Sequence, residues 1–138
     1  MKQFQKIDLK TFTNRDFNLT PVEFKDVIPF DVKRMYYFSD IKPDKQTGEH
    51  CHYVEEEFFF VARGAITAII DSGKGKEEMR LEGPNTAIYV PNYVWHGFKN
   101  ASADCMMIAL TSTNYNPDRG DYLENYEEYL KIRGEHLK

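Results

Sequence analysis

The sequence predicts an all-β domain, a sandwich or barrel of short strands, followed by one C-terminal helix. Short apolar and aromatic runs alternate with turn residues over most of the chain. Aromatic residues make up 14% of the sequence, with ten Phe and nine Tyr, and such residues favour strands. The final segment changes to the three- and four-residue spacing of a helix. A length of 138 residues predicts a single domain, residues 1–138.

Seven strands are predicted in close succession. They cover residues 31–38, 58–61, 65–70, 79–81, 86–90, 95–99 and 105–111. Turn residues separate them, at 62–64, 71–76, 83–85 and 91–92. Turn signals repeated about every 8–12 residues are typical of a sandwich or barrel.

The C-terminal segment predicts a helix capped by Asp121 and ended by Gly134. Its apolar stripe consists of Tyr122, Leu123, Tyr126, Tyr129, Leu130 and Ile132. We expect this stripe to pack on the outside of the barrel or against a second subunit. The consecutive residues 58–60, all Phe, predict a strand buried on both faces, with one face at a subunit interface. This aromatic surface predicts a homodimer.

Charge and cysteine content exclude several classes of protein. Eighteen basic and twenty-two acidic residues give a net charge of −4, which argues against a nucleic-acid partner. No apolar run approaches the length of a membrane span, and the first residues do not resemble a signal peptide. Cys51 and Cys105 are too few for a disulfide framework, so we expect a cytoplasmic protein with no membrane partner.

Three of the four histidines form one pattern with an acidic residue. His50 and His52 are two residues apart, so on a strand both imidazoles point to one face and Cys51 to the other. Glu57 follows His52 at an odd spacing, and a bend is needed to bring it to the same face. His96 comes far downstream. Glu55 and Glu56 are expected in solvent.

These residues resemble the two motifs of the cupin superfamily. Residues 48–57, followed by Gly64, match the first motif, and Gly83, Pro91, His96 and Asn100 match the second. Tyr93 stands where many cupins have glycine. The resemblance implies a cupin-type jelly-roll β-barrel with the histidines in its mouth.

Most of the chain, from about Arg15 onward, is similar to a narrower family, the dTDP-4-keto-6-deoxyglucose 3,4-ketoisomerases (WxcM-like) of bacterial cell-surface sugar synthesis. The matching stretches are residues 28–30, 33–37, the His50/His52 pair, 89–91, 94–96 and 104–107. The resemblance implies an isomerase that acts on a dTDP-linked keto sugar and needs no cofactor. Thr47, Tyr53 and Glu57 depart from the arginine, lysine and glutamine usual in that family.

Moving a carbonyl from C4 to C3 of a sugar requires a base, an enediolate and an acid. Histidine suits both proton transfers, because its ordinary pKa is about 6.5. The candidate catalytic residues are His50, His52 and His96. Glu57 adds a carboxylate to these three imidazoles, so the same four residues are candidate ligands of a divalent metal.

The substrate would carry a diphosphate, which guanidinium groups bind well. Arg15 and Arg34 are the candidate phosphate ligands, and Tyr36 shares a strand face with Arg34. Trp95 is a candidate to stack on the base or the sugar. Two other functions stay open: a metal-dependent cupin of different chemistry, such as an oxygenase or a simple-sugar isomerase, and a non-catalytic sugar-nucleotide-binding cupin.

Overall fold

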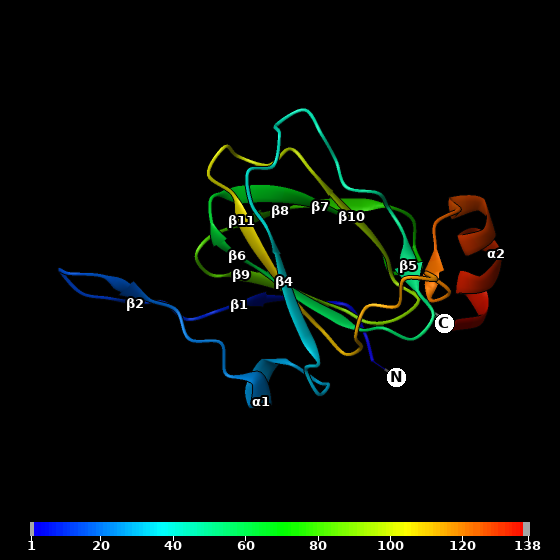
Figure 1. Cartoon of the computed structure of the whole chain (residues 1–138), viewed down its shortest axis with the longest axis horizontal. Helices are drawn as coiled ribbons and strands as arrows, with labels where there is room; N and C mark the ends of the chain where they lie inside the picture. The colour runs from blue at the N-terminus through cyan, green and yellow to red at the C-terminus, as the bar shows by residue number, and fades with distance from the viewer. Residues whose placement is uncertain (1, 137–138) are drawn as a thin grey trace.

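Two antiparallel β-sheets face each other across an apolar core (Figure 1). The structure is a computed structural model that describes residues 2–136, so Met1, Leu137 and Lys138 of the predicted domain lie outside the described residues. The larger sheet has the order β1-β9-β6-β11-β4 and the smaller β10-β7-β8. Their strands are β1 (Gln5–Asp8), β4 (Arg34–Phe38), β6 (Glu57–Arg63), β7 (Ala65–Asp71), β8 (Glu77–Glu82), β9 (Thr86–Val90), β10 (Trp95–Lys99) and β11 (Met106–Thr111).

This arrangement confirms the all-β jelly-roll prediction and refines its shape. Every predicted strand is present, with bounds that differ by at most three residues at an end. Over residues 2–136 the two large sheets share no hydrogen-bonded strand pair, so the predicted barrel is an open sandwich. No helix in this part of the chain has the length and apolar character needed to cross a membrane.

The central strand β6 explains how the core is divided. Phe59 points between the two sheets and packs against Phe98 at a ring distance of 4.9 Å. Phe58 points to the opposite face, where Leu9 and Ile28 cover it. The prediction of burial on both faces is therefore confirmed for these two residues, and the second face is covered by the chain's own N-terminal segment.

The C-terminal helix begins later than the sequence pattern predicts. Tyr122 and Leu123 form β12 (Tyr122–Leu123), which pairs with β5 (Cys51–His52), and the helix α2 spans Tyr126–His136. The cap is Asn125, whose side-chain oxygen accepts the amide of Glu128. Gly134 lies inside the helix and does not end it. Pairing with β5 competes with helix formation at residues 122–123, and Asp121 is thereby freed for another role.

The N-terminal segment forms an arm that the sequence analysis did not anticipate. The hairpin of β2 (Phe12–Thr13) and β3 (Asn18–Leu19) extends away from both sheets (Figure 1), and the short helix α1 (Phe24–Val27) follows it. Phe12, Phe17 and Leu19 are exposed on this arm. Short strands of two residues give little periodicity, which is why the pattern did not reveal them.

Candidate active site

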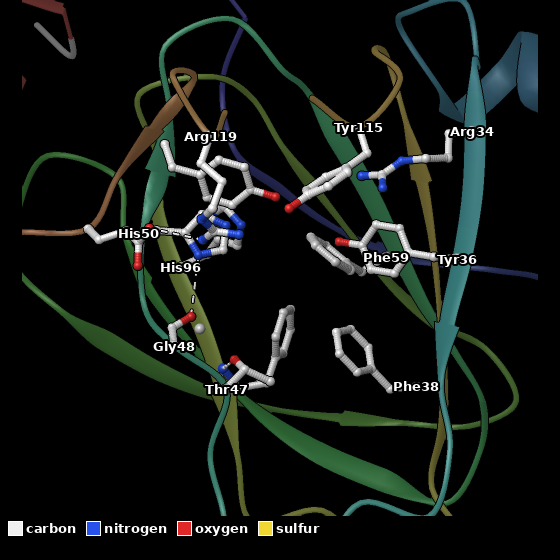
Figure 2. Close-up of a pocket in the computed structure, with 14 residues that line it drawn as sticks. Arg34, Tyr36, Phe38, Thr47, Gly48, His50, Phe59, His96, Tyr115 and Arg119 are labelled. Carbon is white, nitrogen blue, oxygen red and sulfur yellow. Dashed lines mark hydrogen bonds and ion pairs between the residues drawn. The ribbon is translucent and has the colours of Figure 1, made fainter. Parts of the chain in front are cut away.

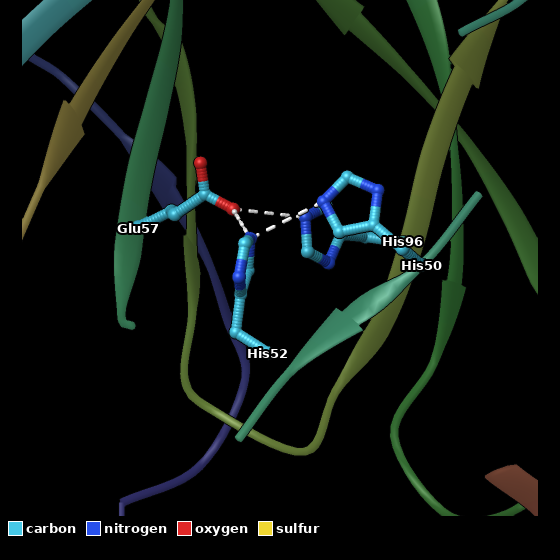
Figure 3. A group of neighbouring side chains, drawn as sticks. All are labelled: His50, His52, Glu57 and His96. Carbon is cyan, nitrogen blue, oxygen red and sulfur yellow. Dashed lines mark hydrogen bonds and ion pairs between the residues drawn. The ribbon is translucent and has the colours of Figure 1, made fainter. Parts of the chain in front are cut away.

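Three separate segments bring the histidines and Glu57 together (Figure 3). His50 and His96 face each other across an antiparallel bridge, with reciprocal backbone hydrogen bonds of 3.0 and 2.9 Å. His52 lies on β5, and Glu57 is the first residue of β6. A bend over residues 53–56 separates β5 from β6, as the odd spacing predicts. Cys51 points the other way and is fully buried beside α2.

The Nε2 atoms of the three imidazoles converge near one carboxylate oxygen. Glu57 Oε1 lies 3.1 Å from His52 Nε2 and 3.0 Å from His96 Nε2. The Nε2 atoms of His50 and His52 are 3.2 Å apart. The other oxygen of Glu57 accepts a hydrogen bond of 2.6 Å from the Tyr36 hydroxyl. His52, Glu57 and His96 are almost completely buried, whereas His50 is partly exposed.

On all three rings the Nδ1 atom is already bound to an oxygen. His50 Nδ1 lies 3.3 Å from the Gly48 carbonyl, His52 Nδ1 3.1 Å from an Asp121 carboxylate oxygen, and His96 Nδ1 3.0 Å from the Val94 carbonyl. These acceptors assign a proton to each Nδ1. Either a second proton or a cation must therefore lie between Glu57 and the Nε2 atoms of His52 and His96.

This donor set fits a divalent first-row metal. Oxygen partners on Nδ1 are what orients metal-binding imidazoles, and three Nε2 atoms with one carboxylate supply four ligands. The ligand atoms of His50, His52, Glu57 and His96 all lie within 4.8 Å of one another. When bound, such a metal would act as a Lewis acid toward a substrate oxygen.

In the absence of a metal, the electrostatics favour an ionised Glu57. Burial alone raises the pKa of this carboxyl, but hydrogen bonds from His52 and His96 outweigh burial and hold the pKa well below its usual value. Burial opposes protonation of His52 too, yet Glu57 raises the pKa of its imidazole above the ordinary value. Burial and the neighbouring imidazoles lower the pKa of His50 to about 3, so the His50 ring stays neutral.

Glu55 is buried, contrary to the expectation that it is solvated. Its side chain is only 5% exposed, and the Thr113 hydroxyl donates to its Oε2 atom. Its Oε1 atom has no hydrogen-bond partner and lies 3.8 Å from Arg34 Nη2 and 3.9 Å from His52 Nε2. The expectation rested on the charge of the residue, and the bend before β6 turns its side chain inward toward Arg34 and Thr113.

A pocket of about 300 Å³ opens beside the histidines (Figure 2). Its floor contains Phe38, Phe59 and Phe98. The other lining residues are Arg34, Tyr36, Thr47, Gly48, His50, His96, Gly97, Tyr115, Arg119, Tyr122 and Glu124. Of the predicted residues, His50, His96, Arg34 and Tyr36 therefore meet at one cavity, while His52 lies behind His50, with Nε2 toward His50 and Nδ1 toward Asp121.

Two predicted substrate-binding residues lie elsewhere. Trp95 is 2% exposed, packs on Tyr126 and Tyr129 of α2, and donates from Nε1 to Glu49. The structure therefore gives Trp95 a packing role and no contact with the pocket. Arg15 lies on the arm, with a side chain that is 93% exposed and 3.6 Å from Asp16. Within a single chain, Arg15 does not line the pocket.

Sequence reasoning missed Asp121, Tyr115, Arg119 and Tyr122 as site residues. They belong to the segment between β11 and α2, which folds back over the histidines. Asp121 was interpreted as the cap of the C-terminal helix, and Tyr115, Arg119 and Tyr122 belong to no recognisable motif. Tyr93 adopts a φ of 65°, a conformation that favours glycine, which accounts for the glycine that many cupins have there.

Comparison with known proteins identifies the family. The family model FdtA, described as "WxcM-like, C-terminal", matches residues 2–134. The chain belongs to the FdtA family. A TDP-4-oxo-6-deoxy-α-D-glucose-3,4-oxoisomerase of Aneurinibacillus thermoaerophilus is 33% identical over 125 residues, which cover 91% of this chain and 88% of that protein.

Solved structures of FdtA-like enzymes have the same fold. A double mutant of the QdtA 3,4-ketoisomerase from Thermoanaerobacterium thermosaccharolyticum, in complex with TDP, aligns with a TM-score of 0.89 at 26% identity and covers 99% of this chain and 98% of its own. The WlaRB TDP-quinovose 3,4-ketoisomerase from Campylobacter jejuni aligns with a TM-score of 0.84 at 27% identity, over 95% and 99% of the two chains.

Proposed function

We propose that this protein is an isomerase that moves the keto group of a dTDP-linked 4-keto-6-deoxyhexose between C4 and C3, for the synthesis of bacterial surface polysaccharide. One observation carries the proposal: His50, backed by His52 and Asp121, stands at the wall of a pocket that also holds two arginines. Membership of the FdtA family and the activities named for its relatives agree with this assignment.

The reaction needs only proton transfers, and the site supplies groups for each. A base removes the proton from C3, which is acidic because it lies beside the C4 carbonyl, and the electrons form an enediolate. O4 and C4 then each take up a proton, while the hydroxyl proton of O3 is lost and the C3 carbonyl forms, so two protons are removed and two are added. His50 faces the pocket as the candidate base, and Tyr36 and His96 line the same pocket as candidate donors to the enediolate.

Solvent exchange tests this assignment directly. Incubation with dTDP-4-keto-6-deoxyglucose in D₂O should introduce deuterium at carbon beside the carbonyl. We expect His50→Asn and His52→Asn to slow exchange by about 10²–10⁴-fold, the usual cost of losing a positioned proton-transfer group, while both variants fold and bind TDP. His136→Asn, on exposed α2, is the control.

Two outcomes of this experiment would change the assignment. Full exchange by a folded His50→Asn variant would transfer the base role to His96. No exchange by the unmodified protein, despite TDP binding, would favour a non-catalytic sugar-nucleotide-binding cupin.

The convergent Nε2 atoms favour one second candidate, a metal-dependent cupin of other chemistry. Metal analysis of protein purified without chelator separates the two readings. About one divalent ion per chain, with activity lost on chelation, would support the metal enzyme. If the protein contains no metal and isomerises, Glu57→Gln should retain measurable turnover, because the amide oxygen in the place of Oε1 still accepts a hydrogen bond from His52, and the amide NH2 can donate to the Tyr36 oxygen.

We also propose that the protein is a cytoplasmic homodimer. The exposed apolar side chains of the arm support association with a second copy of the chain. The two cysteines are both free and buried, which is typical of a reducing compartment.

A further inference from the structure

The pocket contains two guanidinium groups, those of Arg34 and Arg119, which differ in their carboxylate partners and in their exposure. Arg34 lies 4.9 Å above the Tyr36 ring and 3.8 Å from the buried Glu55 carboxylate. Arg119, in the segment between β11 and β12, has a side chain that is 44% exposed and pairs with Glu124 at 2.9 Å. Figure 2 shows Arg34 and Arg119 on opposite sides of the pocket. Arg119 is the more accessible of the two to a ligand that enters from solvent.

The backbone holds Arg119 in a conformation that an arginine rarely adopts. Its φ is 56°, in the left-handed region that glycine tolerates best. Its amide donates to the Asn116 carbonyl at 3.0 Å, and its own carbonyl accepts the amide of Tyr122 at 3.1 Å. These two turns fix the residue at the pocket rim. The turn by itself would favour glycine, so the arginine side chain has a use other than folding.

The guanidinium of Arg119 is oriented as in a group that binds phosphate. Its centre lies 3.9 Å from the centroid of the Tyr122 ring, and this stacking uses the face of the guanidinium, so that the N–H groups at its edge can bind an anion. Glu124 occupies that edge, through a side chain that is 58% exposed. Phosphate oxygens bind the edge of a guanidinium in the same way as a carboxylate does, and can do so at two points. An exposed ion pair contributes little to stability, so a diphosphate can replace this carboxylate.

We propose that Arg119 binds the diphosphate of the substrate, and that Glu124 holds the guanidinium in the free protein and is displaced on binding. The inference rests on the proposed function, because it takes the ligand to be a nucleoside diphosphate sugar. Bound there, the diphosphate leaves the sugar to extend toward His50 and His96, which line the same pocket.

Calorimetric titration with TDP, and with thymidine as the analogue that lacks phosphate, tests the role of Arg119. We expect Arg119→Gly to weaken TDP binding by about tenfold or more and to leave thymidine binding unchanged, since the lost interaction is charge-assisted. Arg119→Gly should not lower the Tm, because glycine relieves the positive φ. Arg63→Gln, at an exposed position on β6, is the matched control. In turnover, KM should rise and kcat should not.

A double-mutant cycle tests the role of Glu124. We expect Glu124→Gln to strengthen TDP binding severalfold in the presence of Arg119 and to have no effect in the Arg119→Gly background. TDP binding to Arg119→Gly within twofold of the parent, or equal losses for TDP and thymidine, would overturn the assignment of Arg119. Weaker TDP binding by Glu124→Gln would overturn the displacement step. A parent protein that binds no TDP would instead contradict the proposed function.

Discussion

Asp121 links the C-terminal segment to the histidines through a single carboxylate. One oxygen lies 3.1 Å from His52 Nδ1 and accepts the Glu55 amide at 3.1 Å, while the other accepts the Val54 amide at 2.7 Å. The carboxylate therefore orients the His52 ring, keeps its Nδ1 protonated and fixes the bend before β6. A helix cap, the role that the sequence suggested, would have used the same carboxylate for amides of α2.

We expect Asp121→Asn to lower kcat by about 10²-fold or more, because the amide nitrogen favours the wrong tautomer of His52. The asparagine oxygen still accepts the Val54 amide, so TDP affinity should change little and the fold should be kept. Steady-state kinetics and nitrogen NMR of the histidine rings measure both effects, with exposed Asp44→Asn as control. A kcat equal to that of the parent would exclude an orienting role.

Asp71, the last residue of β7, connects the helix α2 to the smaller sheet through hydrogen bonds and an ion pair. The Asp71 carboxylate is fully buried and accepts hydrogen bonds from Tyr126, Arg133 and the amides of the following turn. The Tyr129 hydroxyl donates to its backbone carbonyl at 2.8 Å. Burial alone raises the pKa of this carboxyl, but these donors, Tyr126 first, outweigh burial and lower the pKa.

The pKa of the Asp71 carboxyl is lower in the folded protein than in the unfolded chain, where it is about 3.9. The ionised carboxylate therefore stabilises the fold above that pH, and the stabilisation is lost as the pH falls through the pKa of the folded state. We expect Asp71→Asn to lower the free energy of unfolding at pH 7 by about 1–3 kcal/mol, the cost of leaving buried donors unpaired. The difference from the parent should shrink below about pH 4. Urea unfolding of both proteins at pH 7 and below about pH 4 measures this difference in the free energy of unfolding. A difference independent of pH would contradict the ionic contribution.

At the scale of the whole molecule, the exposed apolar side chains of the arm have no explanation within a single subunit. Phe12, Phe17 and Leu19 are 48%, 59% and 55% exposed, on a hairpin that projects away from the two large sheets (Figure 1). Three large apolar side chains on a projecting hairpin favour burial against another surface. A second copy of the chain would bury both arms at once through a two-fold interface.

Light scattering at micromolar concentration should give the mass of a dimer. The double variant Phe12→Ser/Phe17→Ser should shift the mass toward a monomer, because each exposed aromatic side chain loses the burial that drives association. Glu23→Ser, at an exposed position outside the hairpin, is the control. A monomeric mass for the parent protein would contradict the homodimer proposal.

The sequence by itself predicted the strands between residues 31 and 111 that form the two facing sheets, a sandwich or barrel of these strands, and the His50, His52, Glu57 and His96 set. These features depend on local signals: alternation, turn residues and motif spacing, which short-range sterics impose on the backbone. Alternation correctly placed Cys51 away from the histidines. The expectation that a charged residue lies in solvent was wrong for Glu55, which is buried.

Only the tertiary structure decided which residues complete the site. Asp121 lies 69 positions from His52 in the sequence, and Arg119 reaches the pocket because its segment folds back across β5. Trp95 was predicted at the pocket and is buried beneath α2. Local patterns say which face of a strand a side chain occupies, but the neighbour on that face is set by long-range packing of distant segments, which no local signal encodes.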